Sequence, residues 1–344
     1  MQNRFRSIVC SALAVAAVAL SAPAGAQTPE DFYRGKTVTM IVGSTAGATY
    51  DIWGRLVARH LGSHIPGAPN VVVQNMPGAG STLATNHIYN APTQDGSVIG
   101  LMNSTNPFEP LLGVEQAKFD ARKINWLGSP AQDTGVVTLW HSVPVNSFEE
   151  AKTKEVRFAA TSLNGTAAFY VRIFNEVFGT KFKLVFGYPG LTEAMLATER
   201  GEVDGHPSPY WSYLKNAKPD WIRDKKIKFL LQFGRDRNPE LPNVPFAHDL
   251  VTNDADRALI DASVAPLAMG YPFFMGPSAP KDRVAAMRKA FAETFRDPKF
   301  LADAKSQSFE IAPISGEDVE KSLRETYDMP APVLERLRRL YRGE

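Results

Sequence analysis

The sequence is almost free of cysteine, since Cys10 is the only one among its 344 residues. Cys10 falls within residues 1–26, which begin with two arginines, continue with an apolar run over 8–20 and end in small residues up to Ala26. This order is typical of a secretory signal peptide. We therefore predict export to the periplasm with cleavage near Ala26, which leaves a chain without disulfides or thiol chemistry.

Long apolar runs and an excess of charge are also missing. Beyond residue 26 no run of about 20 apolar residues offers a membrane-spanning helix, so we expect a soluble exported protein. Without the two arginines of residues 1–26, the 38 basic residues become 36, which equals the 36 acidic residues. A balanced charge gives no electrostatic basis for binding nucleic acid or an anionic membrane surface. We predict neither as a partner.

Strand and helix patterns alternate along the chain in two similar units. The strand patterns lie at 36–42, 70–76 and 97–103 in the first unit, and at 155–161 and 181–188 in the second. In each unit a loop with glycine and hydroxyl residues separates the first strand from an amphipathic helix. Strand, loop, helix and strand in this order predict parallel sheets with right-handed crossovers. We therefore expect an α/β protein with two lobes.

The chain continues for about a hundred residues beyond the second unit. This tail contains a strand pattern at 227–234 and helix patterns at 281–295 and 333–341, and it is long enough to pack back on the first lobe. We predict a discontinuous first lobe of residues 27–127 and 250–344, and a second lobe of residues 128–249. Such folds bind ligands in a cleft beyond the carboxyl ends of their strands.

The first loop, GSTAGATYD at residues 43–51, lacks the residues of several well-known loops. No lysine follows its glycines, as a triphosphate-binding loop requires, and their spacing does not fit a dinucleotide-binding loop. A hydrolase turn would place its nucleophile at the central position, which is Thr45 in this chain. The histidines show no spacing typical of metal ligands. We expect no cofactor and no metal.

A helix N-terminus after small residues is what this loop does contain. The first turn of a helix has unpaired backbone N–H groups and the positive end of the helix dipole, which favour a bound anion. The loop at Ser162–Thr166 precedes the second unit's helix in the same way. Two such loops facing one cleft would hold a small organic anion. Each loop alone is equally well explained as an ordinary turn between strand and helix.

Four segments together carry a resemblance to a known family: VGSTAGATYDIWGRLVARHL, VVVQNMPGAGSTLATNHIYNAPTQDGSVIG, FGYPGLTEAMLATERGEVDG and LPNVP. The chain resembles the periplasmic solute receptors of tripartite tricarboxylate transporters, the Bug-type binding proteins, from about Lys36 to its last helix. The resemblance implies a two-lobed type II periplasmic binding protein, in which each lobe is a mostly parallel sheet flanked by helices. It also implies a monomer that captures a di-, tri- or aromatic carboxylate for the membrane subunits of a transporter and catalyses nothing.

In this family the backbone amides of the two loops typically grip one carboxylate, and the resemblance assigns the binding residues by position. In the first lobe they are Ser44, Thr45, Ala46, Gly47, Ala48, Tyr50, Asp51, Asn103 and Ser104; in the second they are Ser162, Asn164, Gly165, Thr166, Tyr188, Asp204 and His206. Family members commonly have a proline and an aromatic residue where this chain has Gly43 and Ser44. The edge of the cleft therefore differs, and we carry over no particular ligand.

Other interpretations remain open for several of these residues and for the function. Asp51 polarises a ligand-bound water or caps its helix, and both roles are compatible. Asp204 meets the far end of a ligand or has a structural role, and the aromatic group around His206 lines a pocket or packs a helix. The alternatives to a transport receptor are a ligand-responsive partner of a periplasmic sensor and an exported α/β hydrolase that uses Thr45.

Overall fold

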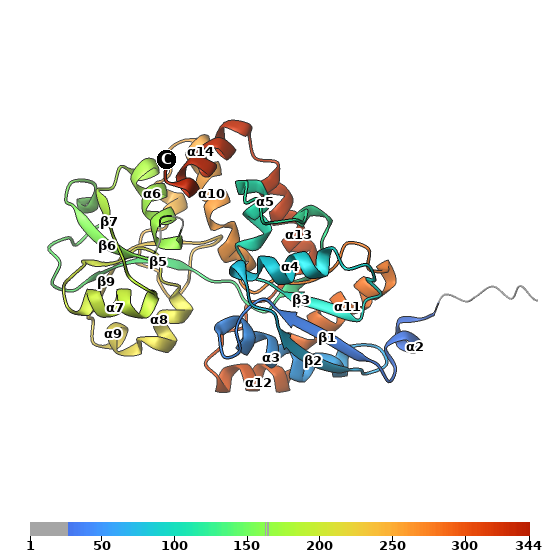
Figure 1. Cartoon of the computed structure of the whole chain (residues 1–344). Coiled ribbons are helices and arrows are strands. Elements are labelled where there is room, and N and C mark those ends of the chain that lie inside the picture. The colour runs from blue at the N-terminus through green and yellow to red at the C-terminus, as the bar shows by residue number, and fades with distance from the viewer. Residues whose placement is uncertain (1–26, 162, 164) are drawn as a thin grey trace, which may run out of the picture.

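The computed structural model describes residues 27–161, 163 and 165–344, which form two lobes, each built on its own β-sheet (Figure 1). The first sheet has the strand order β11-β4-β10-β3-β1-β2, and the second has the order β7-β6-β8-β5-β9. The strands are β1 Thr37–Val42, β2 Asn70–Asn75, β3 Val98–Leu101, β4 Asn125–Ser129, β5 Gly135–Trp140, β6 Val156–Ala160, β7 Phe182–Phe186, β8 Gly205–His206, β9 Ile227–Phe233, β10 Phe273–Met275 and β11 Ile314–Ser315. This architecture confirms the predicted α/β class.

Both sheets are mixed, which corrects the expectation of mostly parallel sheets. Strand β1 pairs in parallel with β2 and β3, and β6 pairs in parallel with β7 and β8, as the repeated units predicted. Strands β10 and β11 run antiparallel to their neighbours, and β5 runs antiparallel to β8 and β9. Strands β5 and β10 follow the segments that pass from one lobe to the other and therefore enter the sheet from the opposite direction, whereas β11 follows α12 within the first lobe.

Helices cover the faces of both sheets. They are α2 Pro29–Tyr33, α3 Thr49–Leu61, α4 Thr82–Tyr89, α5 Glu109–Leu112, α6 Thr166–Phe178, α7 Leu191–Glu199, α8 Trp211–Ala217, α9 Pro219–Arg223, α10 Asp254–Met269, α11 Lys281–Thr294, α12 Pro298–Ser306, α13 Gly316–Tyr327 and α14 Ala331–Arg342. Among the residues described, none of them has the length and apolarity needed to cross a membrane. Helices α3 and α6 matter most for the site, because each follows the first strand of one predicted unit.

Apolar stripes position these two helices. In α3 the side chains of Trp53, Leu56 and Val57 are buried in the core of the first lobe together with Met40 of β1. In α6 the corresponding stripe, which includes Phe174, is buried in the core of the second lobe. Burial of one face of each helix fixes its axis on the sheet, so the start of each helix is held at the end of the preceding strand.

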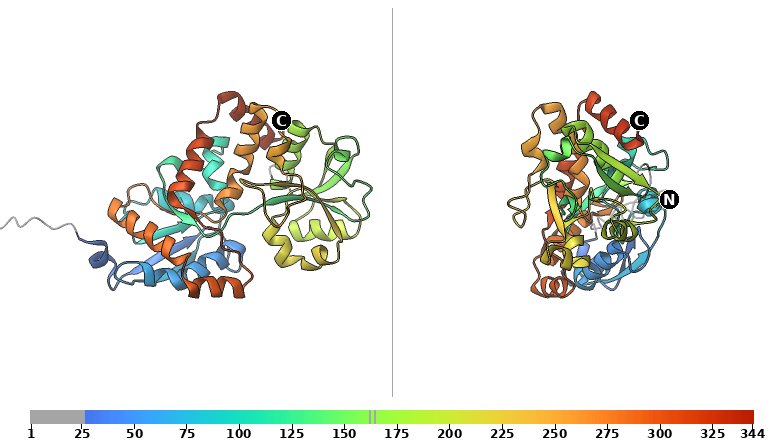
Figure 2. Two further views of the ribbon diagram at one scale, coloured as in Figure 1. Left: turned by 180° about the vertical axis from the view of Figure 1, so that it is seen from behind. Right: turned by 90° about the vertical axis from the view of Figure 1, so that its left-hand side faces the viewer.

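Two of the connections between the lobes run side by side, as the view from behind shows (Figure 2). One connects β4 to β5, and the other is α10 with the residues that follow it. The N–H of Asp133 in the first connection donates to the carbonyl of Leu267 in the second, at 3.1 Å. At Gly270, where φ is +54°, a Cβ would overlap the carbonyl of Ala131. This close contact requires glycine and holds the two connections together between the lobes.

The C-terminal helices divide between the two cores. Helix α11 and β10 join the core of the first lobe, whereas α14 contributes Val333, Leu337 and Leu340 to the core of the second lobe. Residues Leu259 and Ile260 of α10 belong to that second core as well. The predicted lobe boundaries at 27–127 with 250–344 and at 128–249 stay a prediction, and this packing argues for grouping α14 with the second lobe.

Candidate functional site

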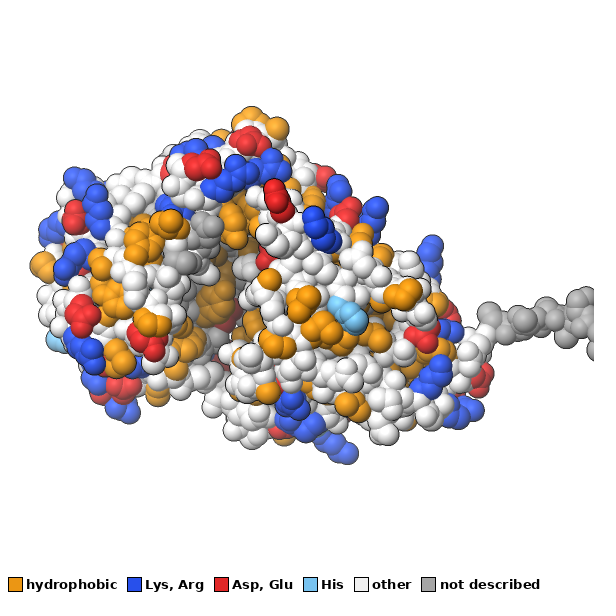
Figure 3. Space-filling view, in the orientation of Figure 1, with side chains coloured by type: hydrophobic (Ala, Val, Ile, Leu, Met, Phe, Trp, Pro, Cys, Tyr) orange, Lys and Arg blue, Asp and Glu red, His pale blue; other side chains and the backbone are white. Residues whose placement is uncertain are grey.

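A hollow separates the two lobes, and its visible walls show apolar and acidic side chains (Figure 3). The loop after β1 reaches the base of this hollow, because Tyr50 is hydrogen-bonded to the connection between the lobes. The Tyr50 hydroxyl donates to the carbonyl of Gly270 at 3.4 Å and accepts from the N–H of Ser104 at 3.1 Å. Two of the predicted residues, Tyr50 after β1 and Ser104 after β3, thus lie together at the cleft.

Asp51 fixes the shape of the first loop. Its carboxylate accepts hydrogen bonds from Gly47 N–H at 2.8 Å, Arg55 Nε at 2.9 Å and Asn75 Nδ2 at 2.8 Å. Burial raises the pKa of Asp51, but these donors outweigh the burial and leave the pKa below its ordinary value. Because Asp51 is only 2% exposed, its geometry favours a structural role over a contact with ligand-bound water.

The free backbone donors of this loop lie at its end, in the first turn of α3. The N–H of Gly47 is bound to Asp51, and the N–H of Ala48 donates to the carbonyl of Thr45 at 3.2 Å. The N–H groups of Thr49 and Tyr50, the first two residues of α3, have no acceptor within the described part of the chain. Thr45 and Ala46 are exposed, and Ser44 is half-buried.

The second loop has a similar geometry where it is described. Ser162 and Asn164 lie outside the described residues. Gly165 takes the extended conformation before α6, with φ −74° and ψ 159°, and α6 then begins at Thr166 without a side-chain cap. Helix α3 begins in the same manner after Ala48, with φ −73° and ψ 161° and no side-chain cap. Both lobes therefore present the start of a 13-residue helix with backbone donors.

Helix α10 holds both helix starts in one region. Tyr50, in the first turn of α3, donates to Gly270 at the end of α10, and Tyr170, near the start of α6, donates to the carbonyl of Ser263 at 2.9 Å. Seven residues separate the two acceptors, which corresponds to about 10 Å along a helix. Helices α3 and α6 are therefore both anchored near their starts to the same connection, through tyrosines whose acceptors lie about 10 Å apart.

Tyrosines from both lobes and one acid gather at the base of the cleft. The rings of Tyr50 and Tyr271 pack edge to face at 5.1 Å between centroids. Tyr210 forms a backbone bridge with Gly135, next to the first connection. Burial raises the pKa of Tyr210 far above its ordinary value, and nearby acidic groups raise it further; they are Tyr170, Tyr50, Asp133 and Tyr271. Tyr170, Tyr271 and Asp133 were missed by the sequence reasoning because no local motif marks them.

The remaining predicted residues differ in how close they come to this site. The N–H of Asn103 donates to Ser81 Oγ at 3.1 Å, and its side chain accepts from Thr105, so Asn103 shapes the loop after β3. Tyr188 packs on the small apolar cluster under α7. His206 is buried in β8, where burial lowers its pKa to about 4. His206 is therefore a neutral side chain at neutral pH.

Asp204 lies toward the opposite end of the second sheet from the loops. Its carboxylate accepts from the backbone N–H of Arg157 at 2.7 Å and from the Arg157 guanidinium at 2.9 Å. Arg157 is the second residue of β6, whereas the predicted loop follows the last residue of that strand. Since a strand rises about 3.3 Å per residue, this ion pair is on the order of 10 Å from the loop, which argues against a ligand contact.

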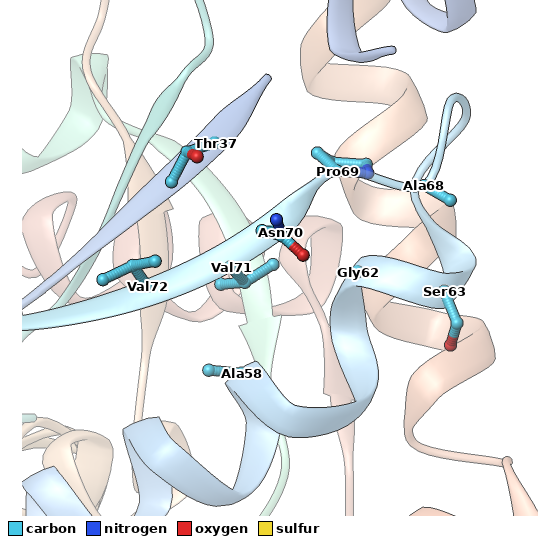
Figure 4. Close-up of a pocket in the computed structure, with 9 residues that line it drawn as sticks. All are labelled: Thr37, Ala58, Gly62, Ser63, Ala68, Pro69, Asn70, Val71 and Val72. Carbon is cyan, nitrogen blue, oxygen red and sulfur yellow. The ribbon is translucent and has the colours of Figure 1, made fainter. Parts of the chain in front are cut away.

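A groove of about 600 Å³ lies elsewhere on the first lobe (Figure 4). Thr37 and Asn70, which begin β1 and β2, line it together with the end of α3. It is thus at the amino ends of the strands, opposite the edge where α/β sheets bind ligands. Within the described ranges, no group of three or more His, Cys, Asp or Glu side chains could hold a metal ion.

The chain matches one protein family and resembles several solved structures of periplasmic binding proteins. The family described as the tripartite tricarboxylate transporter family receptor matches residues 55–338. A TctC solute-binding protein from Polaromonas, solved without ligand, is 19% identical, with a TM-score of 0.69 over 90% of this chain and 98% of that chain. The periplasmic binding protein BugD is 19% identical, with a TM-score of 0.58 over 90% and 98% of the two chains.

Two similar structures contain a ligand. MatC from Rhodopseudomonas palustris with bound malate is 16% identical, with a TM-score of 0.58 over 89% of this chain and 99% of that chain. A protein of R. palustris with adipate is 18% identical, with a TM-score of 0.60 over 89% and 97%. At these identities the similarity shows a shared fold. No curated protein matches the chain.

Proposed function

Because the chain belongs to the tripartite tricarboxylate transporter receptor family, we propose that it is a periplasmic receptor whose lobes close on one carboxylate of a small organic acid. The observation that carries this proposal is the pair of uncapped helix starts, α3 from one lobe and α6 from the other. Both offer backbone donors and a positive dipole end to an anion. A carboxylate that binds both helices favours the closed arrangement, because only there does it contact both lobes.

Several further parts of the proposal follow from the family and the site. The ligand is delivered to the membrane subunits of a transporter by a monomeric receptor, after a signal peptide is removed near Ala26. The malate and adipate in similar structures support a carboxylate as the ligand class. The receptor catalyses no reaction, and its membership of a solute-receptor family supports this part of the proposal.

Proline at the first position of each helix tests the proposed carboxylate site. Thr49→Pro and Thr166→Pro each remove one backbone N–H, while the preceding residue is already extended, as a residue before proline prefers. We expect each variant to fold normally and to bind its carboxylate about 10- to 100-fold more weakly, because a hydrogen bond to a charged group contributes roughly 1.5–3 kcal/mol. Titration calorimetry measures the affinity.

Thr49→Ala and Thr166→Ala are the matched controls, since they remove the hydroxyl and keep the N–H. The ligand for these titrations comes from a thermal-shift screen of malate, adipate, citrate and aromatic acids against the unmodified protein. If neither proline variant weakens binding beyond its alanine control, the carboxylate lies elsewhere. If no carboxylate in the screen raises the melting temperature, the proposed ligand class is wrong.

A further inference from the structure

Asp133 places a carboxylate at the base of the cleft, on the connection between the lobes. It accepts hydrogen bonds from Thr134 N–H at 2.8 Å, from Ser212 N–H at 3.4 Å and from Ser212 Oγ. The side chain is partly exposed, and it forms no ion pair with any described residue. Burial raises the pKa of Asp133 above its ordinary value, and the hydrogen bonds from Ser212 and Thr134 and the charge of Lys215 oppose this rise. Lys215 is itself bound to Glu240 and Glu310. Asp133 is thus an acid whose charge no neighbour neutralises directly.

The surroundings of Asp133 include tyrosines from both lobes. Asp133 lies two residues before Gly135, which bridges to Tyr210, and its N–H donates to the carbonyl of Leu267, three residues before the Gly270 carbonyl that accepts from Tyr50. The rings of Tyr271 and Trp53 lie at 4.8 Å between centroids, which continues the aromatic wall into the first lobe. The loops after β1, β3, β6, β7 and β8 contain no lysine or arginine, whereas the loop after β9 contains Arg235 and Arg237, and Arg237 pairs with Asp249.

This arrangement does not suit an acid with a second carboxylate at its far end. The first carboxylate is held by the helix starts, as the proposed function requires. A second carboxylate that reaches the base of the cleft would meet the Asp133 carboxylate, which has no ion-pair partner among the described residues, and like charges in a partly desolvated site repel strongly. A hydroxyl or ammonium group at the same place would instead donate a hydrogen bond to Asp133.

We propose that Asp133 determines the ligand class: the cleft takes a carboxylic acid with a flat apolar body and a hydrogen-bond donor at the end opposite its carboxylate. The tyrosine rings hold the flat body, and Asp133 receives the donor. Asp133 also excludes dicarboxylates by repulsion, which is how a binding site rejects a close analogue. This inference rests on the proposed function, which supplies the site for the carboxylate at the near end.

Four ring acids of similar size test the inference by titration calorimetry with the full mature protein. They are 4-hydroxybenzoate, which has a donor, 4-methoxybenzoate, which has the same oxygen without a donor, benzoate, and terephthalate, which has a second carboxylate. We expect 4-hydroxybenzoate to bind at least about tenfold more tightly than each of the other three, because a donor to a charged acceptor gains more than a neutral contact. Terephthalate binding as tight as 4-hydroxybenzoate overturns the inference.

The variant Asp133→Asn then tests whether Asp133 causes the preference for 4-hydroxybenzoate over terephthalate. Asparagine has the same shape as aspartate and keeps hydrogen bonds with Ser212. We expect the preference over terephthalate to fall to less than about threefold, because the repelling charge is gone. Glu155→Gln, an exposed acid before β6 at the far end of the second lobe, is the control and should keep the preference. A preference that Asp133→Asn leaves unchanged contradicts the inference, even where 4-hydroxybenzoate binds.

Malate and adipate are included so that two kinds of failure can be told apart. If malate or adipate binds and none of the ring acids does, the carboxylate receptor is supported and the inference about Asp133 is wrong. If no acid of either kind binds, the proposed function fails and the inference fails with it. The comparison of ring acids needs no variant, so the inference remains testable if Asp133→Asn does not fold.

Discussion

The Asp51 carboxylate is bound by one group of its own loop, one of its own helix and one of a neighbouring strand. The contacts to Gly47 and Arg55 are local, and both follow from the position of an acid in the first turn of a helix. The contact to Asn75 comes from β2, which the sequence does not place beside the loop. From the sequence alone, an acid at this position is compatible with a ligand contact and with a structural role. The three hydrogen bonds to Asp51 and the burial of its side chain favour the structural role.

His206 makes stability depend on pH in a definite direction. Burial holds its pKa at about 4 in the folded protein, whereas an unfolded histidine has a pKa of about 6.5. As the pH falls below 6.5 the unfolded chain takes up a proton first, so the free energy of unfolding falls progressively until the pH reaches about 4. We expect His206 to account for a loss of up to about 3 kcal/mol over this range.

Urea unfolding of the unmodified protein and of His206→Asn at pH 7 and pH 4.5 measures this effect. Asparagine keeps an acceptor for the Ser208 N–H, which donates to His206 Nδ1 at 3.3 Å, and it does not titrate. The variant should therefore lose less stability between the two pH values than the unmodified protein. An equal loss in both proteins means that His206 titrates normally or is exposed.

The loop after β2 enters α4 through an unusual backbone path, with four consecutive residues at positive φ. The angles are +148° at Gly78, +44° at Ala79, +60° at Gly80 and +86° at Ser81. Ser81 then links two other loops, because its hydroxyl donates to Gly43 O at 2.9 Å and accepts from Asn103 N–H at 3.1 Å. The loops after β1, β2 and β3 are thereby fastened together beside the cleft.

This link explains why residue 43 is glycine. A Cβ at Gly43 would overlap the side chain of Ser81, so no larger residue fits at this position without displacing Ser81. We expect Gly43→Ala to lower the free energy of unfolding by about 1–3 kcal/mol, as overpacking usually does. Ser81→Gly removes the side-chain atoms that the added methyl group would meet, and the double variant should be more stable than the sum of the two changes predicts.

Chemical denaturation of the two single variants and the double variant measures this coupling. Residues in contact show coupling energies of about 0.5–3 kcal/mol. If the two changes add within about 0.5 kcal/mol, Gly43 and Ser81 do not restrict each other. Circular dichroism of each protein before denaturation shows whether the lobe has kept its fold.

Among the described residues, an ion pair outside the connections links α8 of the second lobe to the first lobe. Lys215 of α8, in the second lobe, is bound to Glu310, which lies between α12 and β11 in the first lobe, and also to Glu240 at 2.7 Å. An exposed pair of this kind contributes at most about 1 kcal/mol. We expect Glu310→Gln to shift the ligand-free protein toward open conformations by no more than about fivefold. Small-angle X-ray scattering should then give a larger radius of gyration.

Glu149→Gln is the control, because Glu149 pairs with Lys152 within the second lobe. It should leave the radius of gyration unchanged. Addition of about 1 M salt to the unmodified protein should reproduce the effect of Glu310→Gln, because salt screens an exposed pair. Equal radii for all three proteins at low salt mean that the pair does not hold the lobes together.

The sequence by itself determined the fold class, the family and the two loops that begin the candidate site. Apolar strand patterns, amphipathic helices and glycine-containing turns are local features, so the repeated units could be predicted without the tertiary structure. The family match over 55–338 confirms the resemblance. Strands β4 and β5 and helix α10 were missed because they connect lobes and pack on partners distant in the chain, so they have no repeated local pattern.

Only the tertiary structure decided which side chains share the cleft. Tyr50, Tyr170, Tyr210 and Tyr271 lie in four separate segments, and they meet because two of the connections between the lobes run side by side. It also placed Asp204 with Arg157, away from the loops, and Asp133 at the base of the cleft. Hydrogen bonding and burial between distant segments fix these positions, and no spacing along the chain specifies contacts of that kind.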